Sequence, residues 1–414
     1  MSIHTKFLSV LACGAIVTGL AVTGPAHAKV DGDTIILGAP LSFTGKYATA
    51  GKHTKNGYDL AITKINAAGG VKVGGKTYKL KVQYYDDEST SARTAQLVER
   101  LVKQDGIQFL LGPYGSGPTA AMAPVVEQLQ VPMVEGNGAS RSIFNKGYKY
   151  TFAVLSTSEQ YLAETLTLAA EWATANGRKP SSLTVALAME NDPFSQDIRA
   201  GLIDDAAKFG MKVIIDDKLP PELNDMSATL TKVKALKPDI LAVSGHSKGA
   251  TLVIRQYSEM KVNVPILSMT HCDSADIAKN FGDKAEYALC GAQWDPNMAY
   301  KDGLFGSARD YANTFEKAFG YAAPYQSAES SAAVQVYADA FQRAKSLSAK
   351  DVRDALADTN MQTFYGNIDF DETGKNIAKP MVLLQVQGGK YVPVAPSKFA
   401  AAKAIMPIPT WDKR

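Results

Sequence analysis

The sequence is poor in the residues on which catalysis and metal binding most often depend. It has three cysteines and five histidines in 414 residues, and His53, His246 and His271 are too scattered to resemble a metal site. No G-x-S-x-G turn is present, and Cys272 has no surrounding motif that identifies a thiolate nucleophile. We therefore expect a protein that is not an enzyme, with no catalytic residues, no metal ion and no other cofactor.

A strong excess of charge of one sign is also missing. The chain has 44 lysines and arginines against 41 aspartates and glutamates, a formal net charge of +3, and no block of like charges. Proteins that bind nucleic acids usually carry a basic patch that pairs with the phosphate backbone. The charge balance therefore argues against a nucleic-acid partner.

Long apolar runs are absent except at the N-terminus. Lys6 is followed by an uncharged stretch that is apolar from Phe7 to Val22, and Ala26-His27-Ala28 is a small-x-small cleavage site. Residues 1–28 are therefore predicted to be an export signal, so that the mature chain starts at Lys29. Cleavage before Cys13, with lipidation of that cysteine, and retention of the segment as a membrane anchor are the alternatives. No later segment has the roughly 18 consecutive apolar residues of a membrane span, which predicts a soluble mature protein.

Only Cys272 and Cys290 remain in the predicted mature chain. An even number of cysteines suits an oxidising compartment, in which disulfides persist. The two residues form either a disulfide or a pair of buried thiols, because the sequence does not show whether their Cβ atoms come close enough to be bridged.

Short apolar runs alternate with amphipathic stretches along the whole chain. Thr34 to Ala39 is predicted to be a strand, and Gly51 to Ala68 is predicted to be a helix that ends at Gly69-Gly70. Further strands are predicted at 107–111, 131–134, 182–189, 212–216, 240–244 and 265–268, and helices at 91–103, 119–128, 195–209, 227–236 and 249–260. Such alternation is typical of parallel sheets connected by crossover helices, so the expected fold class is doubly wound α/β.

One glycine-rich segment is the best candidate for a binding loop. Gly112-Pro113-Tyr114-Gly115-Ser116-Gly117-Pro118-Thr119 follows a predicted strand and leads into a predicted helix. Loops at the carboxyl ends of parallel strands face the crevice in which such folds bind ligands. Backbone N–H groups, the helix dipole and the Ser116 hydroxyl suit a carboxylate, whereas the lysine of a phosphate-binding loop is missing. The alternative is a tight turn in which the glycines only permit close packing.

Other predicted crevice loops supply further candidates. Gly138-Ala139-Ser140 follows the next strand and offers more N–H groups and a hydroxyl, or it is an ordinary helix-capping turn. Tyr47, Tyr114, Tyr161 and Phe194 lie in or near such loops, where they form either apolar walls or plain core. As walls, they would surround a polar ligand with aromatic rings.

Several segments resemble, in their order and spacing, the leucine/isoleucine/valine-type periplasmic binding proteins of ABC transporters. The segments are Leu37 to Gly45, Ile65 to Val71, Tyr85 to Ser89, Gly112 to Ser116 and Phe370 to Gly374. The resemblance covers nearly the whole mature chain and implies the type I solute-binding fold, in which two doubly wound lobes are joined by three crossings. We expect the crossings near 151–155, 290–293 and 364–367. Lobe 1 would then comprise residues 29–152 and 292–363, and lobe 2 residues 153–291 and 364–414.

The resemblance also implies a function in transport. It implies a monomeric periplasmic receptor that binds a small carboxylate, with an amino acid as the first candidate, and delivers it to an inner-membrane ABC permease. Aromatic or aliphatic acids without an amine are the alternative ligands, and a sensory binding protein is the alternative role.

Individual residues take their expected roles from the same resemblance. Ser116 matches the family's carboxylate-binding serine, and Gly138 to Ser140 match its second carboxylate loop. Phe194 stands where amino-acid binders often have a tyrosine, and Asp273 is the candidate partner of an α-ammonium group. The predicted ligand-binding residues are Ser42, Tyr114, Gly115, Ser116, Gly138, Ala139, Ser140, Phe194, His246 and Asp273.

Overall fold

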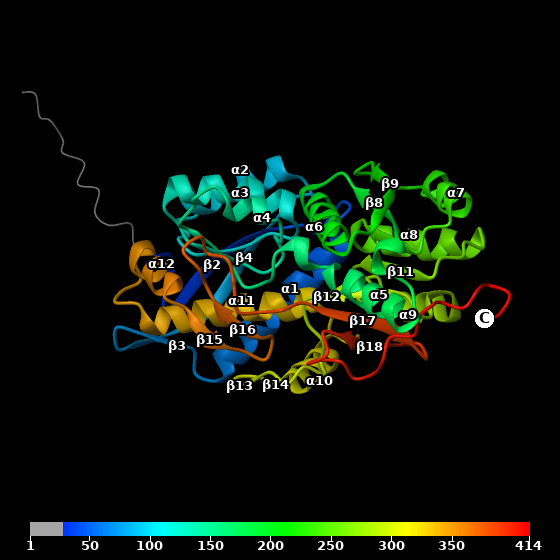
Figure 1. Ribbon diagram of the computed structural model, residues 1–414. Coiled ribbons are helices and arrows are strands. Elements are labelled where there is room, and N and C mark those ends of the chain that lie inside the picture. Colours follow the sequence, from blue (N-terminus) through cyan, green and yellow to red (C-terminus); the bar gives the residue numbers. More distant parts are fainter. Residues whose placement is uncertain (1–27) are drawn as a thin grey trace, which may run out of the picture.

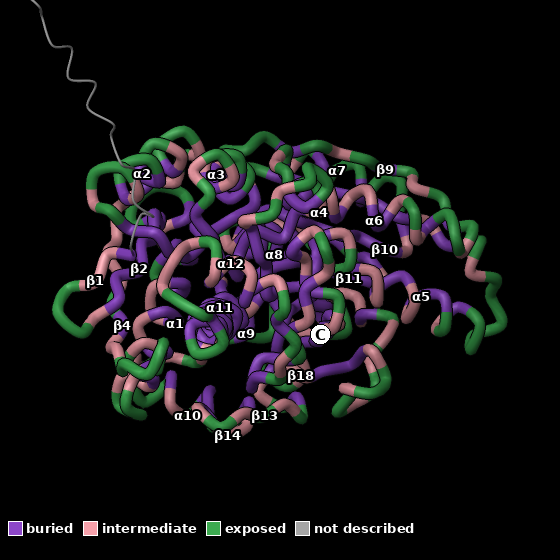
Figure 2. The backbone as a smooth tube through the Cα atoms, turned by 90° about the vertical axis from the view of Figure 1, so that its left-hand side faces the viewer, coloured by how far each residue is buried: buried purple, intermediate pink, exposed green. Residues whose placement is uncertain are grey.

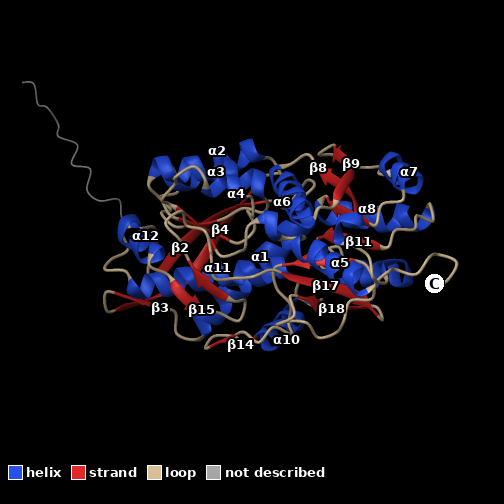
Figure 3. Ribbon diagram, viewed as in Figure 1, coloured by secondary structure: helices blue, strands red, loops and turns tan. Residues whose placement is uncertain are grey.

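The computed structural model of the protein describes residues 28–414 and contains two large twisted sheets with helices packed around them (Figure 1, Figure 3). The predicted export signal lies outside the described residues except for Ala28, and so does Cys13. No helix within residues 28–414 has the length and apolar character that crossing a membrane requires. The α/β class predicted from the sequence, with two lobes built on parallel strands, is confirmed.

The first sheet is formed by the N-terminal part of the chain. Its strands run in the order β3-β4-β2-β5-β6-β7, and β1 pairs with β2. They are β1 (Val30–Asp31), β2 (Thr34–Leu41), β3 (Val71–Val73), β4 (Lys76–Asp86), β5 (Leu110–Leu111), β6 (Met133–Glu135) and β7 (Thr151–Ala153). Helices α2 (Ser91–Lys103) and α3 (Ser116–Leu129) lie on one face, and α1 (Ala48–Ala67) and α11 (Tyr325–Arg343) on the other (Figure 1). Because both faces are covered, β2 is buried along almost its whole length.

The second sheet combines the middle of the chain with its C-terminal part. Its strands run in the order β18-β17-β12-β11-β10-β8-β9. They are β8 (Thr184–Glu190), β9 (Lys212–Leu219), β10 (Ile240–Ser244), β11 (Ile266–Thr270), β12 (Leu289–Ala292), β17 (Val382–Gln387) and β18 (Lys390–Ala395). The helices around it are α5 (Ala163–Ala175), α6 (Pro193–Phe209), α7 (Ser227–Leu236), α8 (His246–Glu259) and α9 (Ile277–Phe281). Strands β8 to β12 pair in parallel, and β17 and β18 extend the sheet in antiparallel fashion.

The remaining elements are short or peripheral. They are α4 (Arg141–Phe144), α10 (Ala308–Phe319), α12 (Ala349–Ala357), the hairpin of β13 (Lys301–Asp302) and β14 (Gly306–Ser307), and the hairpin of β15 (Asn360–Gln362) and β16 (Asn367–Asp369). Three single turns of 3₁₀-helix, at Ser158–Gln160, Pro180–Ser182 and Gly282–Ala285, complete the described chain.

Helix α11 is buried along most of its length although it is rich in polar residues, and Figure 2 shows it in purple. Two of its serines donate to α1: Ser327 Oγ donates to His53 O at 2.9 Å, and Ser331 Oγ donates to Gly57 O at 2.6 Å. A Cβ on Gly57 would lie 2.3 Å from Ser327 O, so only glycine permits this approach of the two helices. The contact fixes the first turns of α11.

Most predicted elements occur where the sequence indicated them. The predicted ranges 91–103, 227–236 and 240–244 coincide with α2, α7 and β10. Helices α3, α6 and α8 begin two or three residues earlier than predicted. For α6 the reason is visible: Asp192 caps the helix by accepting the N–H groups of Phe194 and Ser195, and Pro193 occupies its first position.

Three segments connect the sheets, and their side chains are tied together. The N–H of Ser156, after β7, donates to Gln293 Oε1 at 3.1 Å, and Gln293 Nε2 returns a bond to Ser156 O at 2.8 Å. Ser156 Oγ also donates to Lys379 O at 2.6 Å, just before β17. Residues 364–367 close the β15–β16 hairpin, and Lys375 still bridges to β7. The lobe ranges stay a prediction, and we propose that the third crossing follows Asn376.

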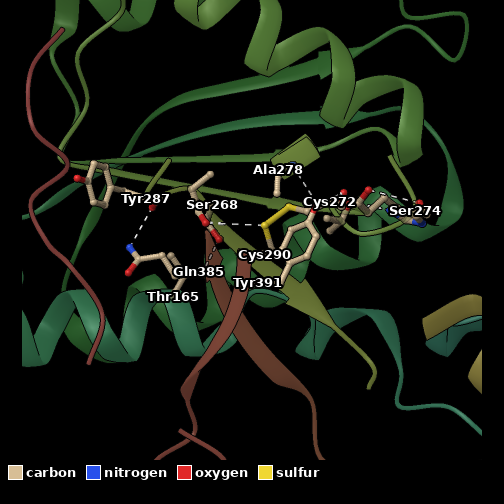
Figure 4. The surroundings of a disulfide bond; sticks show 12 residues. Thr165, Ser268, Cys272, Ser274, Ala278, Tyr287, Cys290, Gln385 and Tyr391 are labelled. Atoms are coloured by element: carbon tan, nitrogen blue, oxygen red, sulfur yellow. Dashed lines mark hydrogen bonds between the residues drawn. A yellow bond between two sulfur atoms is a disulfide. The ribbon is translucent and has the colours of Figure 1, made fainter. Parts of the chain in front are cut away.

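A disulfide joins Cys272 and Cys290 (Figure 4), which decides between the two alternatives left open by the sequence. The Cα atoms are 5.8 Å apart, and the bond links the loop after β11 to β12. Tyr391 Oη, from β18, donates to Cys272 O at 2.7 Å. The loop that carries His271 and Asp273 is therefore braced from two sides.

Candidate functional site

A small cavity lies where the loops of the two sheets meet the start of α11. Its volume is about 10 Å³, room for roughly one water molecule, so the lobes are closed over it. The residues around it are Tyr114, Gly115, Ser116, Asn137, Tyr161, Phe194, His246, His271, Tyr325, Gln326 and Glu329. We call this space the inner cavity.

A larger open cleft of about 620 Å³ adjoins the inner cavity, and we call it the outer cleft. Residues of both lobes line it, among them Lys46 and Tyr47 of the first and Leu223 and Lys248 of the second. Tyr114 and His246 line both spaces. Their side chains therefore form the wall between the inner cavity and the outer cleft.

The first lobe presents a helix N-terminus to the inner cavity. Gly115 precedes α3 with φ at 92°, in the left-handed region that glycine adopts without strain. Ser116 opens the helix, and its Oγ accepts the N–H of Ser140 at 3.0 Å, which leaves its own hydrogen available for a ligand. The positive end of α3 together with this hydroxyl suits a carboxylate, as the sequence predicted.

The second predicted carboxylate loop does not line the inner cavity. The N–H groups of Asn137 and Gly138 donate to Glu135 Oε2 at 2.7 and 2.5 Å, and Ser140 donates to Ser116. Ser140 Oγ also donates to Asp197 of α6 at 2.7 Å, across the gap between the lobes. In this closed form Gly138 thus helps to hold a buried carboxylate, Ala139 O accepts the N–H of Ser158 at 2.8 Å, and Ser140 makes a contact between the lobes.

A tyrosine of the first lobe is bound between two histidines of the second. Tyr114 Oη lies 2.9 Å from His271 Nε2 and 3.2 Å from His246 Nδ1. The histidines follow β11 and β10, with φ at 61° and 53°. A left-handed backbone costs a residue other than glycine roughly 1–2 kcal/mol, so the surrounding structure holds both rings in place against strain.

The pKa values of the two histidines are shifted in opposite directions. Burial lowers the pKa of His246, but the carboxylates of Asp192, 3.6 Å away, and of Glu190 raise it above its ordinary value overall. Burial and the charge on His246 hold the pKa of His271 well below its ordinary value. These shifts favour a charged His246 that donates through Nδ1 to Tyr114; Tyr114 then donates to a neutral His271, whose Nδ1 donates to Thr270 Oγ1 at 3.0 Å.

Several polar groups around the inner cavity have no partner within residues 28–414. Asn137 Oδ1, Tyr325 Oη and both side-chain atoms of the Gln326 amide are buried without a hydrogen bond. Leaving such a group unsatisfied costs about 1–3 kcal/mol, so native proteins rarely do so without a reason. A polar ligand would recover part of this cost.

Two predicted site residues, Asp273 and Ser42, lie outside the inner cavity, and their side chains form hydrogen bonds with other groups. Asp273 Oδ2 accepts the N–H of Tyr325 at 2.9 Å, and the residue lines a separate cleft of about 750 Å³ with His53 and Trp294. Burial raises the pKa of Asp273 to about 6. Ser42 Oγ donates to Asp87 Oδ1 at 2.6 Å and fastens β2 to the end of β4. Neither residue reaches the inner cavity in this closed form.

The structure thus brings five predicted residues to the inner cavity, namely Tyr114, Gly115, Ser116, Phe194 and His246. Tyr161, an aromatic residue noted from the sequence, also lines it. Asn137 and His271 stand beside predicted residues and were missed by one or two positions. Tyr325, Gln326 and Glu329 carry no local signal, because only the close contact of α11 with α1 places them there.

The chain matches known proteins over most of its length. The family model described as periplasmic binding protein matches residues 34–390. The leucine-, isoleucine-, valine-, threonine-, and alanine-binding protein of Pseudomonas aeruginosa is 24% identical over 360 residues, covering 86% of this chain and 90% of that protein. The match to Leu/Ile/Val-binding protein homolog 8 of Brucella suis is 22% identical and spans 61% of either chain.

Solved structures with the same fold hold different ligands. The substrate-binding protein LivJ of Streptococcus pneumoniae, in complex with isoleucine, has a TM-score of 0.74 at 21% identity and covers 90% of this chain and 100% of its own. A solute-binding protein of Rhodopseudomonas palustris, in complex with 3,4-dihydroxybenzoic acid, has a TM-score of 0.74 at 20% identity, with 90% and 99% covered. At these identities the likeness shows the fold alone.

Proposed function

The chain belongs to the periplasmic binding protein family, and we propose that it is the solute-binding subunit of an ABC importer of the branched-chain-amino-acid type. In this proposal it works in the periplasm as a monomer without catalysis, takes up a small carboxylate and presents it to a permease in the inner membrane. An amino acid is the first candidate for the solute.

The observation that carries the proposal is the set of unpartnered polar groups around the inner cavity. Asn137, Tyr325 and Gln326 supply unused donors and acceptors, and the hydroxyl of Ser116 stands beside them at the N-terminus of α3. A carboxylate at Ser116 would gain from the helix dipole, while its neighbours satisfy other polar atoms of the ligand.

Binding requires the lobes to separate, because the inner cavity holds about one water molecule in this form. A ligand would enter through the outer cleft, pass between Tyr114 and His246, and be enclosed when the lobes close. The closed form is stabilised by contacts between the lobes, including Tyr114 with His271 and Ser140 with Asp197. A permease could then distinguish the loaded from the empty receptor by its shape.

An amine-free aromatic acid is the second candidate, and the aromatic wall favours it. The rings of Tyr161 and Phe194 lie 4.9 Å apart, and those of Phe194 and His271 lie 5.3 Å apart, in edge-to-face arrangements. Such rings would pack well on the flat face of a benzoate-like ligand. The structural neighbour that holds 3,4-dihydroxybenzoic acid supports this alternative.

The test is a thermal-shift screen of the mature protein with matched pairs of solutes, namely branched-chain and aromatic amino acids beside the same acids without the amine. A ligand that binds only the folded state raises the midpoint of unfolding by mass action. We expect at least one of these carboxylates to raise it, and Ser116→Ala to abolish the shift. If no carboxylate of either class raises the midpoint, the proposed function is wrong.

A further inference from the structure

The floor of the inner cavity contains more buried negative than positive charge. Glu329 lines the cavity and is 2% exposed, and Glu135, at the end of β6, is fully buried. Lys379 is the only buried lysine or arginine within residues 28–414. Its charge lowers the pKa of Glu329, whereas the charge of Glu135 raises that pKa. Two carboxylates therefore share one cation.

Each of the two carboxylates keeps an oxygen without a hydrogen bond in the described part of the chain. Tyr365 Oη donates to Glu329 Oε2 at 3.2 Å, and no bond reaches Glu329 Oε1. Glu135 Oε2 accepts two backbone N–H groups, while Glu135 Oε1 is buried and unpartnered. A buried carboxylate normally fills more of its acceptor positions, so both groups have capacity for a donor.

Lys379 does not pair with either acid directly. Its Nζ donates to the main-chain oxygen of Gln293 and, at 3.4 Å, to Gln293 Oε1, and it lies 4.4 Å from the centre of the Tyr365 ring. No carboxylate of residues 28–414 comes within ion-pair distance of it. The lysine stabilises the crossings between the lobes, and its charge compensates the acids only from a distance.

Burial makes the charged form of every group on this floor costly. It raises the pKa of Glu329 well above its ordinary value and that of Glu135 to about 7, and it lowers the pKa of Lys379 to about 7. The other charged groups that act on Glu329 are Glu135, Lys379 and Asp273, and the tyrosines around it are Tyr58, Tyr114, Tyr161, Tyr325 and Tyr365. None of these supplies a second cation, so the closed form favours the protonated, neutral state of Glu329.

We propose that Glu329, supported by Glu135, is the subsite for a positively charged group of the ligand, so that the solute is an ammonium-bearing carboxylate rather than an amine-free acid. This inference rests on the proposed function. The ligand's carboxylate lies at Ser116 and its ammonium donates to Glu329 Oε1. The ammonium enters already charged, Glu329 gives its proton to the solvent, and up to one proton is released for each ligand bound.

Isothermal titration of the wild-type protein near neutral pH, in phosphate and in Tris buffer, counts that proton. The two buffers differ in ionisation enthalpy, so a difference in the measured heat reports proton release. The ligands are the amino acid with the largest thermal shift and its counterpart without the amine. We expect release of about one proton with the amino acid, and binding of the amine-free acid on the order of 100-fold weaker, because it leaves the floor uncompensated.

Glu329→Gln tests the residue itself, and Asp273→Asn is the matched control, since Asp273 is also an acid whose pKa is raised by its surroundings but does not line the cavity. We expect Glu329→Gln to abolish both the proton release and the preference for the amine, and Asp273→Asn to keep both. Equal binding of the two ligands without proton release overturns the inference and leaves the proposed function standing. Binding of neither ligand overturns both. The proton count needs no variant, so poor folding of Glu329→Gln would not prevent the decision.

Discussion

Two groups of buried charge flank the inner cavity, and they differ in how they are compensated. At the wall toward the outer cleft, His246 and Lys46 face Asp192 and Glu190, with Lys46 Nζ 3.3 Å from Glu190. Each charge there has a partner of opposite sign. At the floor, Glu135 and Glu329 share the distant Lys379. The wall is complete without a ligand, whereas the floor needs one more positive charge.

The difference separates groups that stabilise the closed form from groups that select the ligand. A compensated group that bridges the lobes, as Lys46 and Tyr114 do, contributes mainly to the stability of the closed form. An uncompensated group contributes to the choice of ligand, because the solute that supplies the missing charge is favoured over one that does not. Variants of the two groups should therefore have different effects.

The largest effect is expected for Lys379→Met. This change removes the only cation of the floor and its bonds to Gln293, and loss of one partner from a buried charge group costs about 3 kcal/mol or more. Denaturant unfolding of the empty protein should show this loss. The amino-acid ligand should recover more stability in the variant than in the wild type, and equal recovery in both would contradict the uncompensated floor.

A smaller effect, dependent on pH, is expected for Glu135→Gln. Burial raises the pKa of Glu135 to about 7, so the folded state holds a proton that the unfolded state has already released above its ordinary pKa. The wild type therefore loses stability as pH rises toward the folded pKa, by up to about 1.4 kcal/mol for each pH unit. The glutamine keeps the two N–H bonds and cannot titrate.

Thermal unfolding of both proteins from about pH 5 to about pH 8 measures this difference. The stability of Glu135→Gln relative to the wild type should rise up to about pH 7 and then level off. Parallel curves would show that Glu135 is ionised throughout.

Tyr114→Phe should weaken the closed form without changing the preference between ligands. It removes the hydroxyl that bridges His246 and His271, worth about 1–1.5 kcal/mol, so affinity should fall roughly tenfold for every ligand alike. Tyr47→Phe is the control, since the Tyr47 ring lies 5.4 Å from that of Tyr114 and its hydroxyl makes no hydrogen bond within residues 28–414. Titration with the paired ligands checks both variants. A changed preference between the ligands would show that Tyr114 also selects the ligand.

The smallest effect is expected for Lys46→Met. The lysine side chain is 23% exposed, and partly exposed ion pairs contribute about 1 kcal/mol or less. Affinity should fall less than about fivefold, and the fall should shrink as salt is added, because salt screens the pair. A large, salt-independent loss would show that the wall is not compensated in the way described.

The sequence predicted the fold and the helix-terminus part of the site, because both depend on local pattern. Alternating apolar runs and the glycine-rich turn before Ser116 are readable in a few adjacent residues. Glu329 is not readable in this way. It lies in a polar stretch of α11 whose sequence resembles an exposed helix face, although contact with α1 buries it. The charged residues that act on it are far away in sequence.

The prediction for Asp273 also shows that local sequence does not reveal which side chain reaches the cavity. The residue lies in the expected loop and is half-buried. Its carboxylate, however, accepts the N–H of Tyr325 and lines the separate cleft in this closed form. Sequence position indicated the loop, and only the packing of α11 decided which acid reaches the cavity.

The most direct test of the role of Glu329 is a crystal structure of the protein grown with the amino acid that gives the largest thermal shift. We predict a closed form with the ligand carboxylate at Ser116 and its nitrogen within about 3 Å of Glu329 Oε1. Ligand density in the separate cleft beside Asp273, or a nitrogen bound there, would contradict this prediction.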